Sequence, residues 1–401
     1  MSVSVVRGAL PARIAEGFSI FRAMSGDRLH FAAHSHHWWP DVAREAQLAA
    51  WDDAARLVDD KWEHVLGEIW SDVKKRIAAI LRLPDENTLV PAPNTHEIIN
   101  RLLSCFPADR PTKIISTDGE FHSFRRQSDR LVEEGLIELI TVPTEPFATF
   151  ADRLVAATHA EPDVDMVFVS QVLFNSGFAL TELEKLVDQL SAPGRFIVID
   201  GYHGFMARPT DLSRIADRAF YIAGGYKYAM AGEGCCFLHA PPGFGARPRN
   251  TGWYASFGAL SAKQSGVPYA EDGWRFMGAT FDPSGLYRMR ATLGWLANED
   301  VGPAELHSHA VALQERFLDA VAARRCGPFE EAQLVVPRSE KARGNFLTFA
   351  HPDANAWYRR LHELDIVADV RGDRLRVGFG AYHTAEDVDH LIARLEQRWR
   401  G

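Results

Sequence analysis

Cysteine, long apolar runs and blocks of one charge are all scarce in this 401-residue chain. The N-terminal stretch MSVSVVRGALPARIAEGF has no long apolar segment, so we predict neither a signal peptide nor a membrane-spanning helix and expect a cytoplasmic protein. The net charge is −9 and no long run of basic residues occurs, so the sequence does not indicate nucleic-acid binding. The four cysteines form no CxxC pair, which disfavours a disulfide framework and a cysteine zinc site; they are Cys105, Cys235, Cys236 and Cys326.

Repeats and low-complexity segments are also absent, and an apolar content of 46% allows a large core. Short apolar runs alternate with helical patterns between residues 51 and 240. This order predicts an α/β fold, with a mostly parallel seven-stranded sheet sandwiched by helices. The runs expected to be strands are 87–92, 112–118, 137–143, 165–172, 195–200, 219–225 and 234–240, and the helical patterns are 51–81, 95–106, 151–160 and 182–192.

Three parts are expected along the chain. Residues 1–50 form an N-terminal segment that lines the active site, 51–285 form the large domain, and 286–401 form a smaller α+β domain. Within the large domain, 243–285 is rich in Gly, Pro and aromatics and is typical of a long functional loop region. The smaller domain has helical patterns at 311–325, 354–366 and 385–399 and strand patterns at 345–351 and 373–380.

Asp200 and Lys227 are the most informative pair of residues. They lie in IVIDGYHGF (197–205) and YIAGGYKYAMAGEG (221–234), where a buried strand pattern ends in a glycine loop. Ligands bind at such strand ends. A carboxylate there can pair with a protonated pyridine nitrogen, and a lysine can form a Schiff base with an aldehyde, which together indicate a pyridoxal phosphate site. Taken singly, Asp200 would be a turn residue and Lys227 a surface lysine.

From about residue 85 to residue 400, the motifs resemble the class V aminotransferase family in their order. This family of fold-type-I pyridoxal phosphate enzymes includes kynureninase, cysteine desulfurases and isopenicillin N epimerase. The resemblance implies that Asp200 meets the pyridine nitrogen and that His203 lies against the ring. GGYKY is similar to the lysine motif of kynureninase, which implies that Lys227 forms the Schiff base and that Tyr226 binds the phosphate.

Other segments resemble the family's cofactor contacts. In PAPNTHEIIN, a strand meets Asn94, Thr95 and His96 where a helical pattern begins, which favours a phosphate, although Asn94 with Glu97 also fits an ordinary capping box. EFHSF assigns ring stacking to Phe121, which as a lone residue would more often be core.

Three more cofactor contacts rest on the resemblance alone. VSQVLFNSG implies that Gln171 reaches the cofactor's phenolic oxygen. RFMGATFDPSG is similar to the segment that reaches over from the partner subunit, which places Thr280 on the phosphate and implies a homodimer with composite sites. TGW resembles a kynureninase motif, which places Trp253 near the phosphate.

The substrate side is assigned to Arg376 and to the N-terminal segment. LRVGFGAYHTAEDVDHL resembles the family's closing strand, whose arginine holds the α-carboxylate; otherwise Arg376 would be a solvent-facing strand residue. FAAHSHHWWP (31–40) departs from the kynureninase pattern, and we expect its His34, Ser35 and His36 to bind substrate. Packing ranks second and a metal site well below it, since the cluster lacks a further ligand.

The predicted protein is an enzyme acting at the Cα of an amino acid. Two departures bear on the reaction: no cysteine lies between Asp353 and Arg376, which disfavours sulfur transfer, and Ile99 stands where kynureninase has a substrate-reading histidine. Kynureninase-like side-chain cleavage is favoured, with transamination as the close alternative. Epimerisation shares the same residues, and a catalytically silent protein that binds pyridoxal phosphate is a further alternative.

Overall fold

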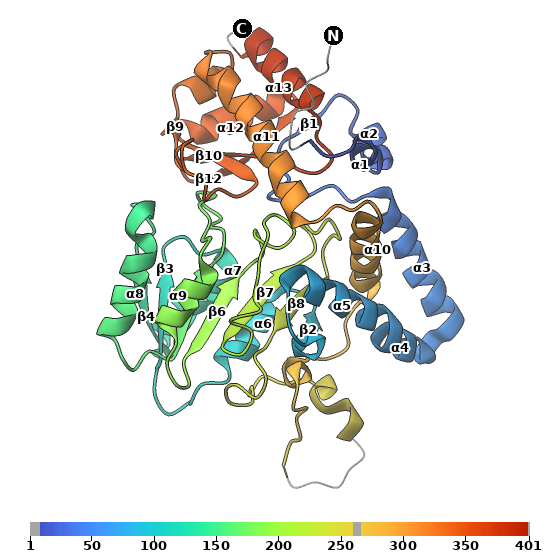
Figure 1. The fold of residues 1–401 in the computed structure, drawn as a ribbon, viewed down its shortest axis with the longest axis vertical. Coiled ribbons are helices and arrows are strands. Elements are labelled where there is room, and N and C mark those ends of the chain that lie inside the picture. The colour runs from blue at the N-terminus through green and yellow to red at the C-terminus, as the bar shows by residue number, and fades with distance from the viewer. Residues whose placement is uncertain (1–8, 260–265, 400–401) are drawn as a thin grey trace.

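The computed structural model describes residues 9–259 and 266–399. Its centre is a seven-stranded sheet with the order β2-β8-β7-β6-β5-β3-β4 (Figure 1). All neighbours pair in parallel except β8, which runs antiparallel to β7 and β2. The predicted mostly parallel sheet is therefore confirmed. Its strands are β2 (Leu89–Ala92), β3 (Thr112–Thr117), β4 (Ile137–Val142), β5 (Met166–Ser170), β6 (Phe196–Asp200), β7 (Ala219–Gly224) and β8 (Cys236–His239).

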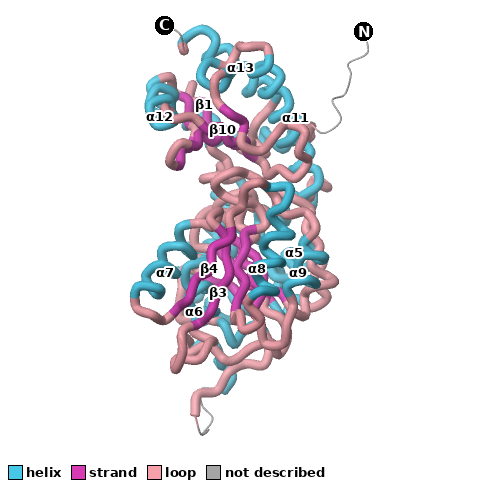
Figure 2. The backbone as a smooth tube through the Cα atoms, turned by 90° about the vertical axis from the view of Figure 1, so that its left-hand side faces the viewer, coloured by secondary structure: helices cyan, strands magenta, loops and turns pink. Residues whose placement is uncertain are grey.

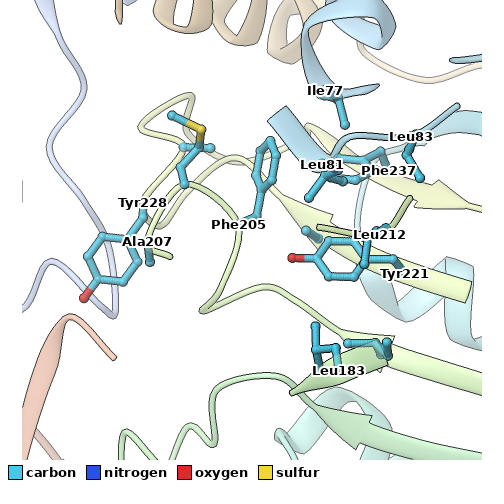
Figure 3. Packing of buried hydrophobic residues seen from close by; sticks show 14 of the residues in the cluster. Ile77, Leu81, Leu83, Leu183, Phe205, Ala207, Leu212, Tyr221, Tyr228 and Phe237 are labelled. Carbon is cyan, nitrogen blue, oxygen red and sulfur yellow. The ribbon is translucent and has the colours of Figure 1, made fainter. Parts of the chain in front are cut away.

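Helices cover both faces of the sheet because successive side chains of each buried strand point to opposite sides. Val167 and Val169 of β5 pack with α5, α8 and α9, whereas Met166 and Phe168 pack with α6 and α7 (Figure 2). Figure 3 shows part of the first cluster, where Leu81 of α5 faces the strands beside Phe237. The bounds are α5 (Trp70–Leu81), α6 (Thr95–Leu103), α7 (His122–Glu133), α8 (Phe150–Ala160) and α9 (Leu183–Leu190).

The helical pattern at 51–81 is broken rather than continuous. Helix α3 (Asp41–Leu57) begins ten residues earlier than that pattern, and Val58 then takes a positive φ of 50°. Short turns, α4 (Lys61–His64) and a π-helical turn at Val65–Ile69 lead into α5. The apolar pattern continues across this break, which is why the sequence did not reveal it.

A smaller α+β layer lies above the sheet in Figure 1. Its antiparallel sheet has the order β12-β13-β10-β9 and packs on three helices. The N-terminal segment joins it, since β1 (Leu29–His30) pairs in parallel with β11 (Ile366–Val367). The other elements are β9 (Gln333–Leu334), β10 (Phe346–Ala350), β12 (Asp369–Arg371), β13 (Arg374–Gly378), α11 (Pro303–Ala322), α12 (Ala354–Glu363) and α13 (Ala385–Arg398).

Helix α10 (Ser284–Asn298) joins the two parts and packs against α3 and α5. Two short helices, α1 (Ala12–Glu16) and α2 (Ser19–Ser25), lie beside the smaller layer (Figure 1). Among its described residues, the predicted loop region 243–285 has short 3-10 turns at Trp253–Ala259 and Gly273–Phe276 before α10 begins at Ser284. The region extends away from the sheet, and its residues 260–265 lie outside the described part (Figure 1).

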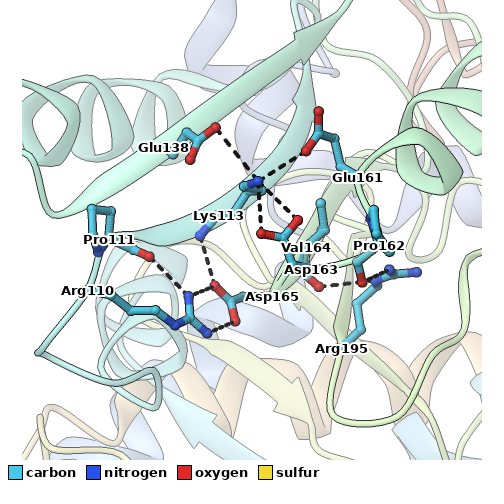
Figure 4. A network of polar contacts seen from close by, with 10 residues as sticks. All are labelled: Arg110, Pro111, Lys113, Glu138, Glu161, Pro162, Asp163, Val164, Asp165 and Arg195. Atoms are coloured by element: carbon cyan, nitrogen blue, oxygen red, sulfur yellow. Dashed lines mark hydrogen bonds and ion pairs between the residues drawn. The ribbon is translucent and has the colours of Figure 1, made fainter.

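Charged residues gather at the amino ends of the parallel strands (Figure 4). Lys113 of β3 lies 3.0 Å from both Glu161 and Asp163, and Arg110 pairs with Asp165 at 2.6 Å. The predicted site lies at the opposite, carboxyl ends of the strands, since Asp200 ends β6 and Lys227 follows the end of β7. Within the described part of the chain, no helix combines the length and the apolar character needed to cross a bilayer.

Candidate active site

The two residues singled out in the sequence lie at neighbouring strand ends. Asp200 is the last residue of β6, and Lys227 follows β7 by three residues. Both loops need glycine: a Cβ on Gly201 would lie 2.0 Å from the Tyr221 ring, and one on Gly224 would lie 2.4 Å from the Cys236 sulfur. These glycines let the backbone turn closely past the neighbouring strand after β6 and after β7, so the side chains of Asp200 and Lys227 reach the same end of the sheet.

A cavity of about 180 Å³ opens at this edge. Residues from five separate stretches of the sequence line it, and they include both Asp200 and Lys227. The full lining is Pro93, Asn94, Thr95, His96, Phe121, Ser123, Ser170, Val172, Phe174, Asp200, Tyr202, His203, Tyr226, Lys227, Glu233, Gly234 and Cys236.

Lys227 is buried among aromatic rings. Its Nζ lies 2.8 Å from His203 Nε2 and 5.1 Å from the centre of the Phe121 ring. The Tyr202 and Tyr226 rings lie at 4.8 and 5.6 Å. Burial lowers the pKa of Lys227 to about 7, against the opposing charge of Asp200. At neutral pH, the amine is therefore available as a nucleophile.

The cavity shifts the pKa values of Asp200 and His203 in different directions. Burial raises the pKa of Asp200, while the Tyr202 N–H, 2.9 Å from its Oδ1, and the charge of Lys227 lower it. Burial lowers the pKa of His203 well below its usual value, so this imidazole is neutral. Its Nδ1 is buried and has no hydrogen-bond partner among the described residues.

Helix α6 starts at the cavity. Asn94 is its N-cap, and its side chain accepts a hydrogen bond of 2.9 Å from the Glu97 N–H. The first helical residues, Thr95 and His96, line the cavity beside it. Asn94 thus caps the helix and lines the cavity at the same time. The positive end of the helix dipole faces the cavity, where it would stabilise an anion.

Tyr226 and His36 form the rim. Tyr226 lines the cavity, and the His36 ring stacks on it with ring centres 5.2 Å apart. His36 Nε2 lies 3.7 Å from Glu233 and is exposed, while Ser35 is half-buried beside it. His37 packs instead: its Nε2 accepts from the Ala381 N–H at 3.1 Å.

Gln171 does not line the cavity. Its amide donates to Thr210 at 2.8 Å and accepts from Tyr221 at 3.0 Å. Strand alternation turns the neighbouring residues Ser170 and Val172 towards the cavity instead. We therefore leave Gln171 out of the site proposed below.

Trp253 and Thr280 lie on the long extension, outside the cavity lining. The Trp253 ring is half exposed and stacks on Tyr254 with centres 4.0 Å apart. Thr280 is exposed. Neither residue therefore contributes to the cavity of its own chain.

Arg376 is buried behind the cavity wall. Its guanidinium bonds to the Asp369 carboxylate and the Phe174 carbonyl, and its carbon lies 5.7 Å from the centre of the Phe174 ring, which lines the cavity. The alternative that Arg376 faces solvent is wrong, since it is 3% exposed. His34 is fully buried nearby, with Nε2 3.6 Å from Asp369.

Two carboxylates of this region were missed in the sequence. Glu120 is buried and accepts from the Ser170 hydroxyl at 2.5 Å and the Thr117 hydroxyl at 2.6 Å, which ties the ends of β5 and β3 together. Asp369 pairs across the sheet with Arg376. A signal existed for Asp369, because it and Arg376 are equidistant from the turn at Gly372 and Asp373.

Other missed residues line the cavity itself. Tyr202 lies inside the recognised DGYH motif, and Cys236 begins β8, the strand that follows the lysine loop. The Tyr202 hydroxyl lies 3.4 Å from the Cys236 sulfur. Strand alternation and adjacency to the recognised motifs were the available signals.

Comparison with known proteins supports the resemblance. The profile of the kynureninase C-terminal domain family matches residues 306–395. Kynureninase of Deinococcus radiodurans is 25% identical over 363 residues, which cover 84% of each chain. The cysteine desulfurase CsdA of Escherichia coli is 22% identical over 348 residues, or 81% of each chain.

Solved structures share the fold. A C-DES variant with glycine covalently linked to its PLP cofactor has a TM-score of 0.79 at 19% identity, covering 95% of this chain and 98% of that chain. The apo cysteine desulfurase of Thermococcus onnurineus has a TM-score of 0.77 at 16% identity, covering 98% of both. The predicted fold class is thereby confirmed as the fold type I of pyridoxal phosphate enzymes. The chain is therefore similar in sequence to kynureninases and cysteine desulfurases, matches the kynureninase C-terminal domain family over residues 306–395, and has a class V aminotransferase-like fold.

Proposed function

We propose that this protein is a pyridoxal phosphate enzyme that cleaves the side chain of an amino acid. The observation that carries the proposal is the meeting of Asp200 and Lys227 in one cavity between Phe121 and the start of α6. When bound, pyridoxal phosphate supplies an electron sink for the pair left at Cα when a bond there breaks.

The residues present fit this cofactor. Asp200 would pair with the pyridine nitrogen, Lys227 would bond to the aldehyde carbon, and Phe121 would face the ring. Asn94, Thr95 and His96, with Tyr226 beside them, would hold the phosphate at the start of α6. The buried Nδ1 of His203, which no described residue satisfies, is the polar atom that a ligand in this cavity would complete.

Lys227 would also handle the proton at Cα. A lysine with a pKa near 7 can both accept and return a proton at neutral pH, which suits a general base. Arg376 would hold the α-carboxylate, with the buried His34 behind it, and Ser35 and His36 would lie towards the substrate side chain from the N-terminal segment. The domain boundaries after residues 50 and 285, and the role of residues 1–50 in lining the active site, also belong to the proposal.

Kynureninase-like cleavage is the favoured reaction, supported by the C-terminal domain match and by the relative in D. radiodurans. Transamination by the same residues is the alternative. Sulfur transfer from a cavity thiolate is disfavoured, because burial raises the pKa of Cys236 to about 12, and a protonated thiol is a poor nucleophile.

A homodimer with composite sites remains part of the proposal, since Thr280 and Trp253 are exposed on the extension. A partner subunit's copies of these residues would then reach the phosphate. The cytoplasmic location stays a prediction.

Titration of the purified, cofactor-loaded protein with a panel of amino acids that includes kynurenine tests the reaction. Side-chain cleavage products identified by mass spectrometry support the proposal, whereas a keto acid together with the pyridoxamine form of the cofactor establishes transamination. Lys227→Ala tests the alternative of a silent binding protein: turnover equal to that of the wild type would remove the lysine from the mechanism.

A further inference from the structure

The group expected to bind the substrate carboxylate is already occupied. Arg376 lies opposite Asp369 in the register of β13 and β12, and its Nη2 bonds to Asp369 Oδ2. Its Nη1 bonds to the Phe174 carbonyl oxygen, and its Nε has no hydrogen-bond partner among the described residues. The donor fork is thus only partly filled: a backbone carbonyl holds Nη1, and a carboxylate of the protein itself holds Nη2.

A second carboxylate cannot simply join this pair. Arg376 is 3% and Asp369 7% exposed, so two carboxylates at one guanidinium would repel each other with little screening by water. Full bidentate binding of a substrate carboxylate needs two neighbouring donors of the fork. Because the Phe174 carbonyl already holds Nη1, the available pair is Nε with Nη2, and a substrate carboxylate on that pair competes with Asp369 at Nη2.

His34 is placed to bind the displaced carboxylate. Its Nε2 lies 3.6 Å from Asp369 Oδ2, just beyond hydrogen-bond length. Neither ring nitrogen has a hydrogen-bond partner among the residues described. The ring is held by stacking on Phe346, with centres 4.6 Å apart. A buried imidazole with two unsatisfied nitrogens is costly unless it gains a partner in another state of the protein.

Asp369 would keep its charge balanced during such a move. Its other oxygen, Oδ1, accepts a hydrogen bond of 2.5 Å from Arg371, which is on the same strand and more exposed. Because Arg371 stays bound, the carboxylate needs only a small rotation of its second oxygen towards His34.

We infer that Asp369 competes with the substrate's carboxylate for Arg376, and that His34 binds Asp369 when the substrate displaces it. Both are positioning residues, acting through Arg376. The inference rests on the proposed function, in which Arg376 binds the α-carboxylate. Its consequence is selectivity, since only a ligand whose carboxylate replaces that of Asp369 occupies this end of the site.

The experiment measures the dissociation constants of L-alanine and of its neutral amide, L-alaninamide, from the change in visible absorbance of the cofactor-loaded enzyme. The isosteric Asp369→Asn should bind L-alanine about 10-fold more tightly, with the affinity for L-alaninamide unchanged, because the competing charge is gone. His34→Phe, which keeps the ring stack but removes the nitrogens, should bind L-alanine about 10-fold more weakly, again without effect on L-alaninamide.

Weaker L-alanine binding by Asp369→Asn, or equal changes for the two ligands in both variants, would overturn the inference and leave Asp369 as a structural partner of Arg376. Arg376→Gln separates this result from failure of the proposed function. If that variant binds L-alanine as well as the wild type does, the inference fails together with the carboxylate role of Arg376, while the proposed cofactor site stands. If the protein acquires no visible absorbance with pyridoxal phosphate, the proposed function fails as well.

Discussion

Replacing Glu120 with glutamine should change how the stability of the cofactor-free protein depends on pH. Burial raises the pKa of Glu120 from 4.5 to about 7, although the Ser170 and Thr117 hydroxyls that it accepts from oppose the rise, and the charge of Asp200 adds to it. The folded protein therefore holds a proton that the unfolded chain releases above pH 4.5. This contribution to stability is complete below pH 4.5 and is lost as the pH rises through 7.

The size of the effect follows from the two pKa values. Their difference corresponds to about 3 kcal/mol at pH 8, at 1.36 kcal/mol for each pH unit. Glutamine has the shape of the protonated acid, and its amide can donate to Ser170. Glu120→Gln should therefore match the wild type near pH 5 and exceed it by up to about 3 kcal/mol near pH 8.

Urea unfolding at intervals between pH 5 and 8 measures this difference directly. Comparing the two proteins at each pH cancels the other titrating groups, as long as they are unaffected by the substitution. Curves that stay parallel over the whole range would refute the reasoning, because Glu120 would then titrate alike in the folded and unfolded chains.

Two further predictions concern the strand ends of the site. The rate at which pyridoxal phosphate modifies Lys227, measured by trapping the adduct with borohydride, should rise with pH and have its midpoint near pH 7. Asp200→Asn should move that midpoint to lower pH, because the charge of Asp200 raises the pKa of Lys227. A midpoint near pH 10, or an upward shift in the variant, would contradict this. Gly201→Ala should lower the free energy of unfolding in urea by about 1–3 kcal/mol, because the added Cβ would lie 2.0 Å from the buried Tyr221 ring. Gly67→Ala is the control: its Cβ meets nothing within 4 Å, so this substitution should be neutral or stabilising. Equal effects of the two substitutions would refute the steric argument.

Strand patterns and glycine loops were enough to predict the sheet and the pair at its edge. Buried parallel strands such as 196–200 appear in the sequence as continuous apolar runs, and parallel strands end at a common edge. That geometry brings Asp200 and Lys227 together without any further information. The two-residue strands β1, β9 and β11 carry too little pattern to be found, and their position depends on tertiary contacts.

The details of side-chain pairing lay beyond the sequence motifs. Gln171 was assigned from its place in a motif, but strand alternation turns it to Thr210, away from the cavity. The assignment of Arg376 to the α-carboxylate rests on the family resemblance and stays a prediction, and its pairing with Asp369 depends on the register of a short hairpin. His34 reaches them from the turn after β1, and β1 pairs with a strand far along the chain, which no local pattern encodes.

The most direct test of the account is the location of the cofactor bond. Purified protein is incubated with pyridoxal phosphate, reduced with borohydride, digested and mapped by mass spectrometry, with Lys227→Ala treated in parallel. The account predicts a visible absorbance band before reduction, and one reduced adduct, on Lys227, that is missing from the variant. No band, or an adduct spread over surface lysines and equal in the two proteins, would contradict it.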